Sequence, residues 1–186
     1  MIKLSGHAIS KIDRSDARYQ ALIEVHSRLS KKDSTIWGKG AQAEAAMRLN
    51  WIDLPESSRE LLPALDALYA KHRDKSTVIL CGMGGSSLGP EVIAQSFKKK
   101  LFILDSTDPD YVAHALNVDL AKTVVVVSSK SGSTIETASQ RALFESAFTQ
   151  ASLTPQNHMV VVTDPGSPLD KQSRDAGYSV INADPN

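Results

Sequence analysis

Five short apolar runs constrain the fold of the second half of this chain more than any other feature. They are rich in valine and isoleucine and cover residues 77–81, 101–104, 123–128, 159–163 and 178–181. Each gap between two runs is long enough for a helix. Because the runs lack polar alternation, we expect strands that are buried on both faces, which requires a parallel sheet with helices on either side. The sequence therefore predicts an α/β fold with a doubly wound, five-stranded parallel sheet.

Proline and glycine mark the expected helix ends in these gaps. Asp108-Pro109 and Ser167-Pro168 each place a capping residue before a proline that suits the first helical position. Pro90 with Glu91 predicts the first turn of another helix, and Gly177 is typical of a helix stop.

The residues before position 75 show helical periodicity instead. Apolar side chains recur at helical spacing from Tyr19 to Leu29, from Ala43 to Met47 and from Leu61 to Tyr69. We therefore expect an N-terminal helical extension over residues 1–75 and the doubly wound domain over residues 76–186. Trp37, Trp51 and the stripe from Leu61 to Tyr69 are expected to pack in a core or between helices.

A hydroxyl-rich segment, Ser128-Ser129-Lys130-Ser131-Gly132-Ser133-Thr134, separates the third apolar run from an amphipathic helix. A phosphate monoester needs short converging donors, a close backbone and positive potential. Here hydroxyls are the donors, Gly132 relaxes the backbone, and the free N–H groups of the following helix add further donors and the positive dipole end. The structural alternative is a capping box, because Ser133 and Glu136 have the spacing of one.

A glycine-rich segment, Cys81-Gly82-Met83-Gly84-Gly85-Ser86-Ser87-Leu88-Gly89-Pro90, follows the first apolar run. Its adjacent glycines let a ligand touch the backbone, and its two serines add hydroxyls. The alternative is a dinucleotide loop, although Ser87 stands where the third glycine of that motif is required. No Gly-Lys-Ser/Thr ends the segment, which excludes a Walker loop.

The two segments are predicted to meet at one edge of the sheet. If the strand order is 2-1-3-4-5, the ligand crevice of such a sheet lies between its first and third strands, at their carboxyl ends. Both hydroxyl-bearing segments follow those two strands, so we expect a phosphate site between them.

Composition excludes several other classes of function. The formal net charge is zero and aromatic residues make up 5%, which argues against a nucleic-acid surface. Lys98-Lys99-Lys100 is interpreted as the solvated end of a helix. Cys81 is the single cysteine, so neither an intrachain disulfide nor a thiolate metal site is expected. No run of 18 apolar residues indicates a membrane span, and we expect a cytoplasmic protein without a metal or cofactor.

Several motifs, in the right order, resemble the sugar isomerase (SIS) domain of the glucose-6-phosphate isomerase family. They are residues 82–90, Leu104-Asp105-Ser106-Thr107-Asp108-Pro109, residues 128–137 and Thr163-Asp164-Pro165-Gly166-Ser167. Asp33 to Gly38 and Arg48 to Trp51 also resemble the helical lead-in of bacterial members, including those fused to transaldolase.

This resemblance implies a flavodoxin-like three-layer fold and the interconversion of glucose 6-phosphate and fructose 6-phosphate through an enediolate. It also implies a homodimer for the full-length enzyme. The sugar-phosphate contacts of the family fall on Gly85, Ser86, Ser129, Lys130, Ser131, Gly132, Ser133 and Thr134. Many members have Ser-Lys-Thr-Phe-Thr-Thr where this chain has Ser-Lys-Ser-Gly-Ser-Thr, a form closer to general sugar-phosphate SIS domains.

The resemblance assigns no catalytic residue to this chain. The family's glutamate base, histidine, lysine and arginine belong to sequence after the first of two SIS domains, so we expect a truncated enzyme that is inactive alone. Glu136 is interpreted as a capping partner, and the five histidines have no motif spacing. The alternative is a non-catalytic sugar-phosphate-binding SIS module, or the isomerase half of another sugar-phosphate enzyme. A regulator would carry a basic helix-turn-helix reader, and none is evident.

Overall fold

The computed structural model describes residues 5–7 and 9–182 and divides into two compact units. The first unit ends at Ser57 and the second begins at Ser58. No helix among the described residues is both long enough and apolar enough to cross a bilayer.

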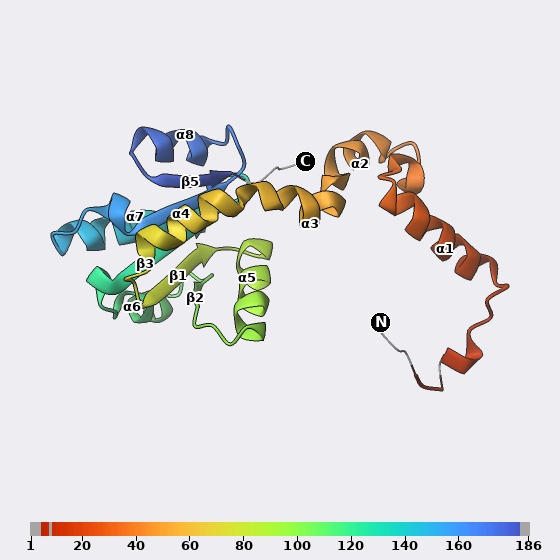
Figure 1. Ribbon diagram of the computed structural model, residues 1–186, viewed down its shortest axis with the longest axis horizontal. Helices are drawn as coiled ribbons and strands as arrows, with labels where there is room; N and C mark the ends of the chain where they lie inside the picture. The colour runs from red at the N-terminus through yellow and green to blue at the C-terminus, as the bar shows by residue number, and fades with distance from the viewer. Residues whose placement is uncertain (1–4, 8, 183–186) are drawn as a thin grey trace. The chain divides into compact units, whose positions relative to one another are not determined.

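The second unit contains the parallel sheet (Figure 1). Its strands are β1 (Thr77–Gly82), β2 (Phe102–Leu104), β3 (Thr123–Ser128), β4 (Met159–Thr163) and β5 (Ser179–Asn182). All neighbouring strands pair in parallel, in the order β2-β1-β3-β4-β5. The predicted α/β class, strand number and strand order are confirmed.

Helices fill the gaps between these strands. They are α5 (Gly85–Ser96), α6 (Pro109–Leu116), α7 (Ile135–Gln150) and α8 (Pro168–Asp175), with α4 (Leu62–His72) ahead of β1. Short 3-10 turns are η4 (Ser58–Leu61), η5 (Leu120–Lys122) and η6 (Pro155–Asn157). Right-handed crossovers place α6, α7 and α8 on one face of the sheet and α5 on the other.

The core of the second unit lies under α6, α7 and α8. Phe144 and Phe148 of α7 are fully buried, and they pack with alternate residues of β1, β3 and β4 such as Cys81 and Val127. Ala115 of α6 and Leu169 of α8 complete this cluster. Burial of such a layer is the main favourable contribution to folding, and it fixes the carboxyl edge of the sheet where the loops begin.

Two of the expected helix starts are confirmed and one is wrong. The carboxylate of Asp108 accepts hydrogen bonds from the first turn of α6, and the Ser167 hydroxyl oxygen accepts one from the Asp170 N–H at the start of α8. Gly177 follows α8 with a φ of +80°, as expected of a helix stop. Pro90, however, lies inside α5, which begins at Gly85. The reason is Gly84, whose φ of +58° turns the chain directly after β1.

The first unit is helical, as its periodicity predicts. It contains η1 (Ile9–Lys11), α1 (Ala17–Ser30), η2 (Ser34–Trp37), α2 (Gln42–Arg48), η3 (Leu49–Asp53) and α3 (Leu54–Ser57). The Asp33 carboxylate caps η2 and accepts a hydrogen bond from the Arg28 side chain, which fixes the turn after α1.

The expectation that the tryptophans pack in a core is wrong. Trp37 is 52% exposed and Trp51 is 57% exposed. Leu49 is the one buried hydrophobic residue among those described in this unit. In the second unit, the predicted apolar stripe from Leu61 to Tyr69 is not fully buried either, because Leu65 and Tyr69 are exposed. Helical spacing gathers apolar side chains on one face, but a second layer must cover that face to bury them.

Candidate functional site

The two predicted segments lie side by side at the carboxyl edge of the sheet. Strands β1 and β3 are neighbours, and Gly82 pairs with Ser128 in their register. A Cβ on Gly82 would lie 3.1 Å from the Ser128 carbonyl oxygen and 3.3 Å from the Ser86 Cβ. Glycine at position 82 therefore allows Ser86 and the end of β3 to approach each other closely.

Only one serine of the first segment is available to a ligand. The Ser87 hydroxyl is buried and donates to the Gly84 carbonyl at 2.9 Å, so it stabilises the turn. Ser86 is half-buried, and Gly84 and Gly85 are exposed. The sequence expectation that both serines add hydroxyls is wrong for Ser87.

The second segment folds around the hydroxyl group of Ser129, which is 4% exposed. This oxygen accepts a hydrogen bond from the Gly132 N–H at 3.2 Å and donates one to the Thr134 hydroxyl oxygen, also at 3.2 Å. The hydroxyls of Ser131 and Ser133 lie 3.0 Å apart and are exposed, as is Lys130. The structure thus brings the segment into a closed loop with buried and exposed donors.

The capping-box interpretation of Ser133 and Glu136 is wrong. Thr134, not Ser133, is the N-cap residue of α7, and its side chain makes no capping hydrogen bond. The Ser133 N–H donates to Ser131 at 3.3 Å instead. No side chain therefore caps the first N–H groups of α7, which can donate to an anion.

A pocket of about 220 Å³ opens behind this loop, between α7 and α8. It is lined by Val127, Ser129, Gly132, Thr134, Thr137, Ala138, Arg141, Ala142, Glu145, Leu169 and Gln172. Of the predicted site residues, Ser129, Gly132 and Thr134 line it, whereas Gly85, Ser86, Lys130, Ser131 and Ser133 do not.

Thr137 is a candidate that sequence reasoning missed. It is 1% exposed, lines the pocket, and its hydroxyl has no hydrogen-bond partner among the described residues. A buried hydroxyl without a partner is costly, which favours a ligand or water there. Its position three residues after Thr134 was the available signal, because this spacing puts both on one helix face.

An ion pair closes the far end of the pocket. The Arg141 Nε atom lies 2.8 Å from the Glu145 carboxylate, and the Arg141 guanidinium lies 5.6 Å from the centre of the Tyr178 ring. Burial, reinforced by a hydrogen bond with Glu145, raises the pKa of the Tyr178 hydroxyl. The charge of Arg141 is therefore already compensated by Glu145.

None of the five histidines lines the pocket. His158 is 5% exposed, its Nδ1 atom lies 3.0 Å from the Thr123 carbonyl oxygen, and its ring stacks on Phe148. His158 is thus packed inside the fold. Among the described residues, no group of three or more potential ligands is arranged to hold a metal ion.

Comparisons with known proteins agree on one family. Residues 68–172 match the sequence model of the phosphoglucose isomerase family. A glucose-6-phosphate isomerase of Chlamydia felis is 39% identical over 178 residues, which cover 91% of this chain and 31% of that protein.

Two solved structures are similar in fold. The crystal structure of a glucose-6-phosphate isomerase from Chlamydia trachomatis has a TM-score of 0.62 and 32% identity, over 84% of this chain and 30% of that one. A hypothetical protein from Thermus thermophilus has a TM-score of 0.72 and 29% identity, over 89% of this chain and 40% of that one. The chain matches 24–32% of the length of its curated relatives.

Proposed function

Because the chain belongs to the phosphoglucose isomerase family, we propose that its two loops bind the phosphate of glucose 6-phosphate and fructose 6-phosphate in a glucose-6-phosphate isomerase. The observation that carries this proposal is the uncapped start of α7, surrounded by the hydroxyls of Ser129, Thr134 and Thr137. Helix N–H groups and short hydroxyl donors are the groups that a phosphate dianion needs.

The hydrogen bonds within the loop favour Thr134 as a direct donor. Ser129 donates its hydroxyl hydrogen to the Thr134 oxygen, so the Thr134 hydrogen is left for a ligand. We therefore assign Thr134 and Thr137 to the phosphate oxygens and Ser129 to the support of Thr134. Gly85, Ser86 and Lys130 remain proposed contacts at the exposed side of the same edge.

Phosphate binding alone does not catalyse isomerisation. It holds the ground state and the transition state alike, whereas the chemical barrier falls only through interactions that strengthen at the reacting carbons. A base must move a proton between C1 and C2, and another group must stabilise the enediolate. Glu145 is the one carboxylate lining the pocket, and it is already engaged by the Arg141 guanidinium at 2.8 Å. We propose that the described residues position the substrate and do not supply the base.

Titration calorimetry with glucose 6-phosphate tests the binding. Loss of one hydroxyl hydrogen bond to a charged phosphate costs about 1.5–3 kcal/mol, or roughly ten- to hundredfold in affinity. We expect a loss of this size for Thr134→Ala, and a similar one for Ser129→Ala because Thr134 then loses the donor that orients it. Ser139→Ala is the matched control, because the Ser139 hydroxyl lies on the exposed side of α7 and donates to the Ile135 carbonyl. Unchanged affinity in both site variants would contradict the proposal.

A general sugar-phosphate-binding SIS module is the second candidate, favoured by the Ser-Lys-Ser-Gly-Ser-Thr form of the second loop. A coupled assay for fructose 6-phosphate conversion separates binding from catalysis, with a Chlamydia trachomatis glucose-6-phosphate isomerase at equal molarity as reference. We expect binding without turnover by residues 1–186. Turnover within tenfold of the reference would show that this chain does supply a base.

By family resemblance, we further propose a cytoplasmic location and a homodimer for the whole enzyme.

A further inference from the structure

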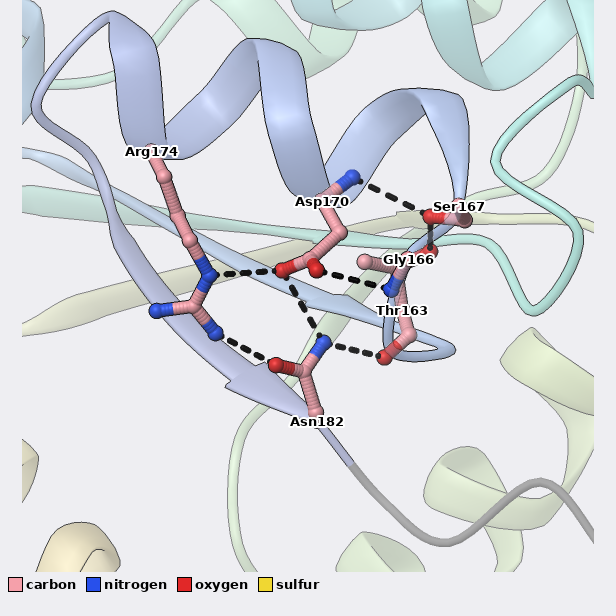
Figure 2. Close-up of polar contacts among 6 residues, drawn as sticks. All are labelled: Thr163, Gly166, Ser167, Asp170, Arg174 and Asn182. Atoms are coloured by element: carbon pink, nitrogen blue, oxygen red, sulfur yellow. Dashed lines mark hydrogen bonds and ion pairs between the residues drawn. The ribbon is translucent and has the colours of Figure 1, made fainter.

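Figure 2 shows a continuous hydrogen-bond network. It contacts the loop of residues 128–134, called the phosphate loop below, through a hydrogen bond from Thr163 to the Ser129 carbonyl. It joins the loop after β4, the first turns of α8 and the end of β5 through Thr163, Gly166, Ser167, Asp170, Arg174 and Asn182. The proposed binding function does not use any of these side chains directly, so their role needs a separate explanation.

The direction of each hydroxyl bond follows from the donors available. Thr163, which is 3% exposed, donates its single hydroxyl hydrogen to the Ser129 carbonyl at 2.7 Å. The 2.8 Å contact between the Thr163 and Ser167 hydroxyls must then use the Ser167 hydrogen. The Ser167 oxygen in turn accepts the Asp170 N–H at 3.1 Å. The bonds therefore run in one direction, from α8 to Ser129, and bonds in such a chain polarise one another.

Strand β4 holds the loop backbone from the same side. The Ser129 N–H donates to the Val162 carbonyl at 3.0 Å, and the Asp164 N–H donates to the Lys130 carbonyl at 3.2 Å. The Thr163 hydroxyl donates to the Ser129 carbonyl as well. Both the N–H and the carbonyl of Ser129 are therefore bonded to residues of β4. The orientation of the Ser129 hydroxyl, and through it that of Thr134, follows from this backbone.

The network is itself anchored to α8 and β5. The Asp170 carboxylate accepts bonds from the Gly166 N–H at 2.9 Å, the Arg174 Nε at 2.8 Å and the Asn182 Nδ2 at 3.2 Å. The Asn182 Nδ2 also donates to the Thr163 carbonyl at 3.0 Å. Thr163 is thus held from its carbonyl as well as from its hydroxyl, which limits its freedom to follow the loop.

We propose that Thr163 and Ser167 are positioning residues for the phosphate loop: they hold the Ser129 carbonyl and thereby fix the Ser129 hydroxyl, which in turn aims the Thr134 hydroxyl at a bound phosphate monoester. This inference rests on the proposed function. Neither residue lines the pocket, so we expect the effect of either on binding to pass through Ser129.

Two variants of Thr163 separate positioning from packing. Thr163→Val keeps the volume and removes the hydroxyl, whereas Thr163→Ser keeps the hydroxyl and removes the methyl group. We expect the valine variant to bind glucose 6-phosphate and inorganic phosphate about tenfold more weakly, because the Ser129 carbonyl loses its donor. The serine variant should retain wild-type affinity even though its lost methyl group lowers the thermal midpoint. A purely structural role would make affinity follow stability instead.

The matched control is Thr149→Val on α7. The Thr149 hydroxyl also donates to a backbone carbonyl at 2.7 Å, that of Glu145, but it lies on the exposed side of the helix. Its removal should leave both affinities unchanged. A double variant with Ser129→Ala adds a further check, because positioning through Ser129 predicts that the two losses are strongly non-additive.

Hydrogen exchange at the Gly132 amide gives a reading that needs no ligand. This N–H donates to the Ser129 hydroxyl, so Thr163→Val should speed its exchange about tenfold and Thr163→Ser should not. Unchanged Gly132 exchange in the valine variant, or equal loss of affinity in both variants, would overturn the positioning role. If wild-type chain binds neither probe, the proposed function fails, and the exchange measurement still decides whether Thr163 sets the loop.

Discussion

The fold leaves no room for a side chain at Gly132. Its φ is +68°, and a Cβ there would lie 2.8 Å from the Leu169 Cβ and 2.9 Å from the Ser167 hydroxyl. Alanine would therefore be strained by its backbone and would push the loop away from the start of α8. We expect Gly132→Ala to lower the free energy of unfolding by about 1–3 kcal/mol and to weaken phosphate binding.

Gly89→Ala is the matched control for this prediction. Gly89 lies inside α5, and a Cβ there meets no atom within 4 Å. Alanine in a helix interior stabilises by roughly 0.5–1 kcal/mol relative to glycine. Urea unfolding of both variants makes the comparison, and a Gly132→Ala protein as stable as wild type would contradict the account.

His72, in the last turn of α4, makes stability depend on pH. Both of its ring nitrogens are buried without a hydrogen-bond partner among the described residues. Burial, with smaller contributions from Lys71 and Lys75, lowers the pKa of this imidazole below 6.5. Below pH 6.5 the unfolded chain therefore binds a proton that the folded chain does not, so stability falls as the pH drops from about 6.5 through the lowered pKa.

Urea midpoints between pH 5 and pH 8 measure this effect. We expect His72→Gln to flatten the fall in midpoint below about pH 6.5, because the variant has no proton to bind there. His26→Gln is the control, since His26 is exposed on α1. If the His72 variant and the wild type have the same slope, His72 is not the titrating group.

At the scale of whole elements, the strands could be predicted from the sequence because each apolar run is buried on both faces. The run at 123–128 coincides with β3, and the run at 159–163 coincides with β4. The hydroxyl-rich loop of residues 128–134 could also be located from the sequence, since residue types set which donors are present. Strand order then brought Ser86 to the end of β3, as a 2-1-3-4-5 sheet requires.

Features that depend on tertiary contacts could not be predicted in the same way. The Ser133 side chain has capping spacing, yet Ser131 engages it, and the Thr134 oxygen accepts from Ser129 instead of capping α7. Local sequence does not show whether the hydroxyls of Ser133 and Thr134 bond to the first N–H groups of α7 or to other hydroxyls of the loop. The exposure of Trp37 and Trp51 has a similar cause, because periodicity identifies an apolar face but not what covers it.

At the scale of the whole molecule, the two units differ in how much apolar surface they bury. Leu49 is the one buried hydrophobic residue described in the first unit, and full burial of one leucine contributes about 1.5–3 kcal/mol. Ordering the backbone costs about 1–2 kcal/mol per residue. Helices of 14 and 7 residues do not offset that cost by themselves. The second unit, by contrast, buries two phenylalanines and the central strands in one cluster.

We predict that the independently folding domain begins before α4. The apolar pattern puts the domain boundary near residue 75, whereas α4 clusters with the sheet that follows it. The Lys71 ammonium at the end of α4 donates to the Ser179 hydroxyl at 3.1 Å, and Leu68 is half-buried. Without α4, the packing of Leu68 and the Lys71–Ser179 hydrogen bond are lost, which lowers the free energy of unfolding by roughly 1 kcal/mol or more. A loss of this size lowers the melting temperature of a domain of this size by several degrees. We therefore expect residues 58–186 to melt cooperatively and residues 76–186 to melt at a lower temperature, as followed by circular dichroism. Equal melting temperatures would place the boundary at residue 75 and make α4 part of the helical extension.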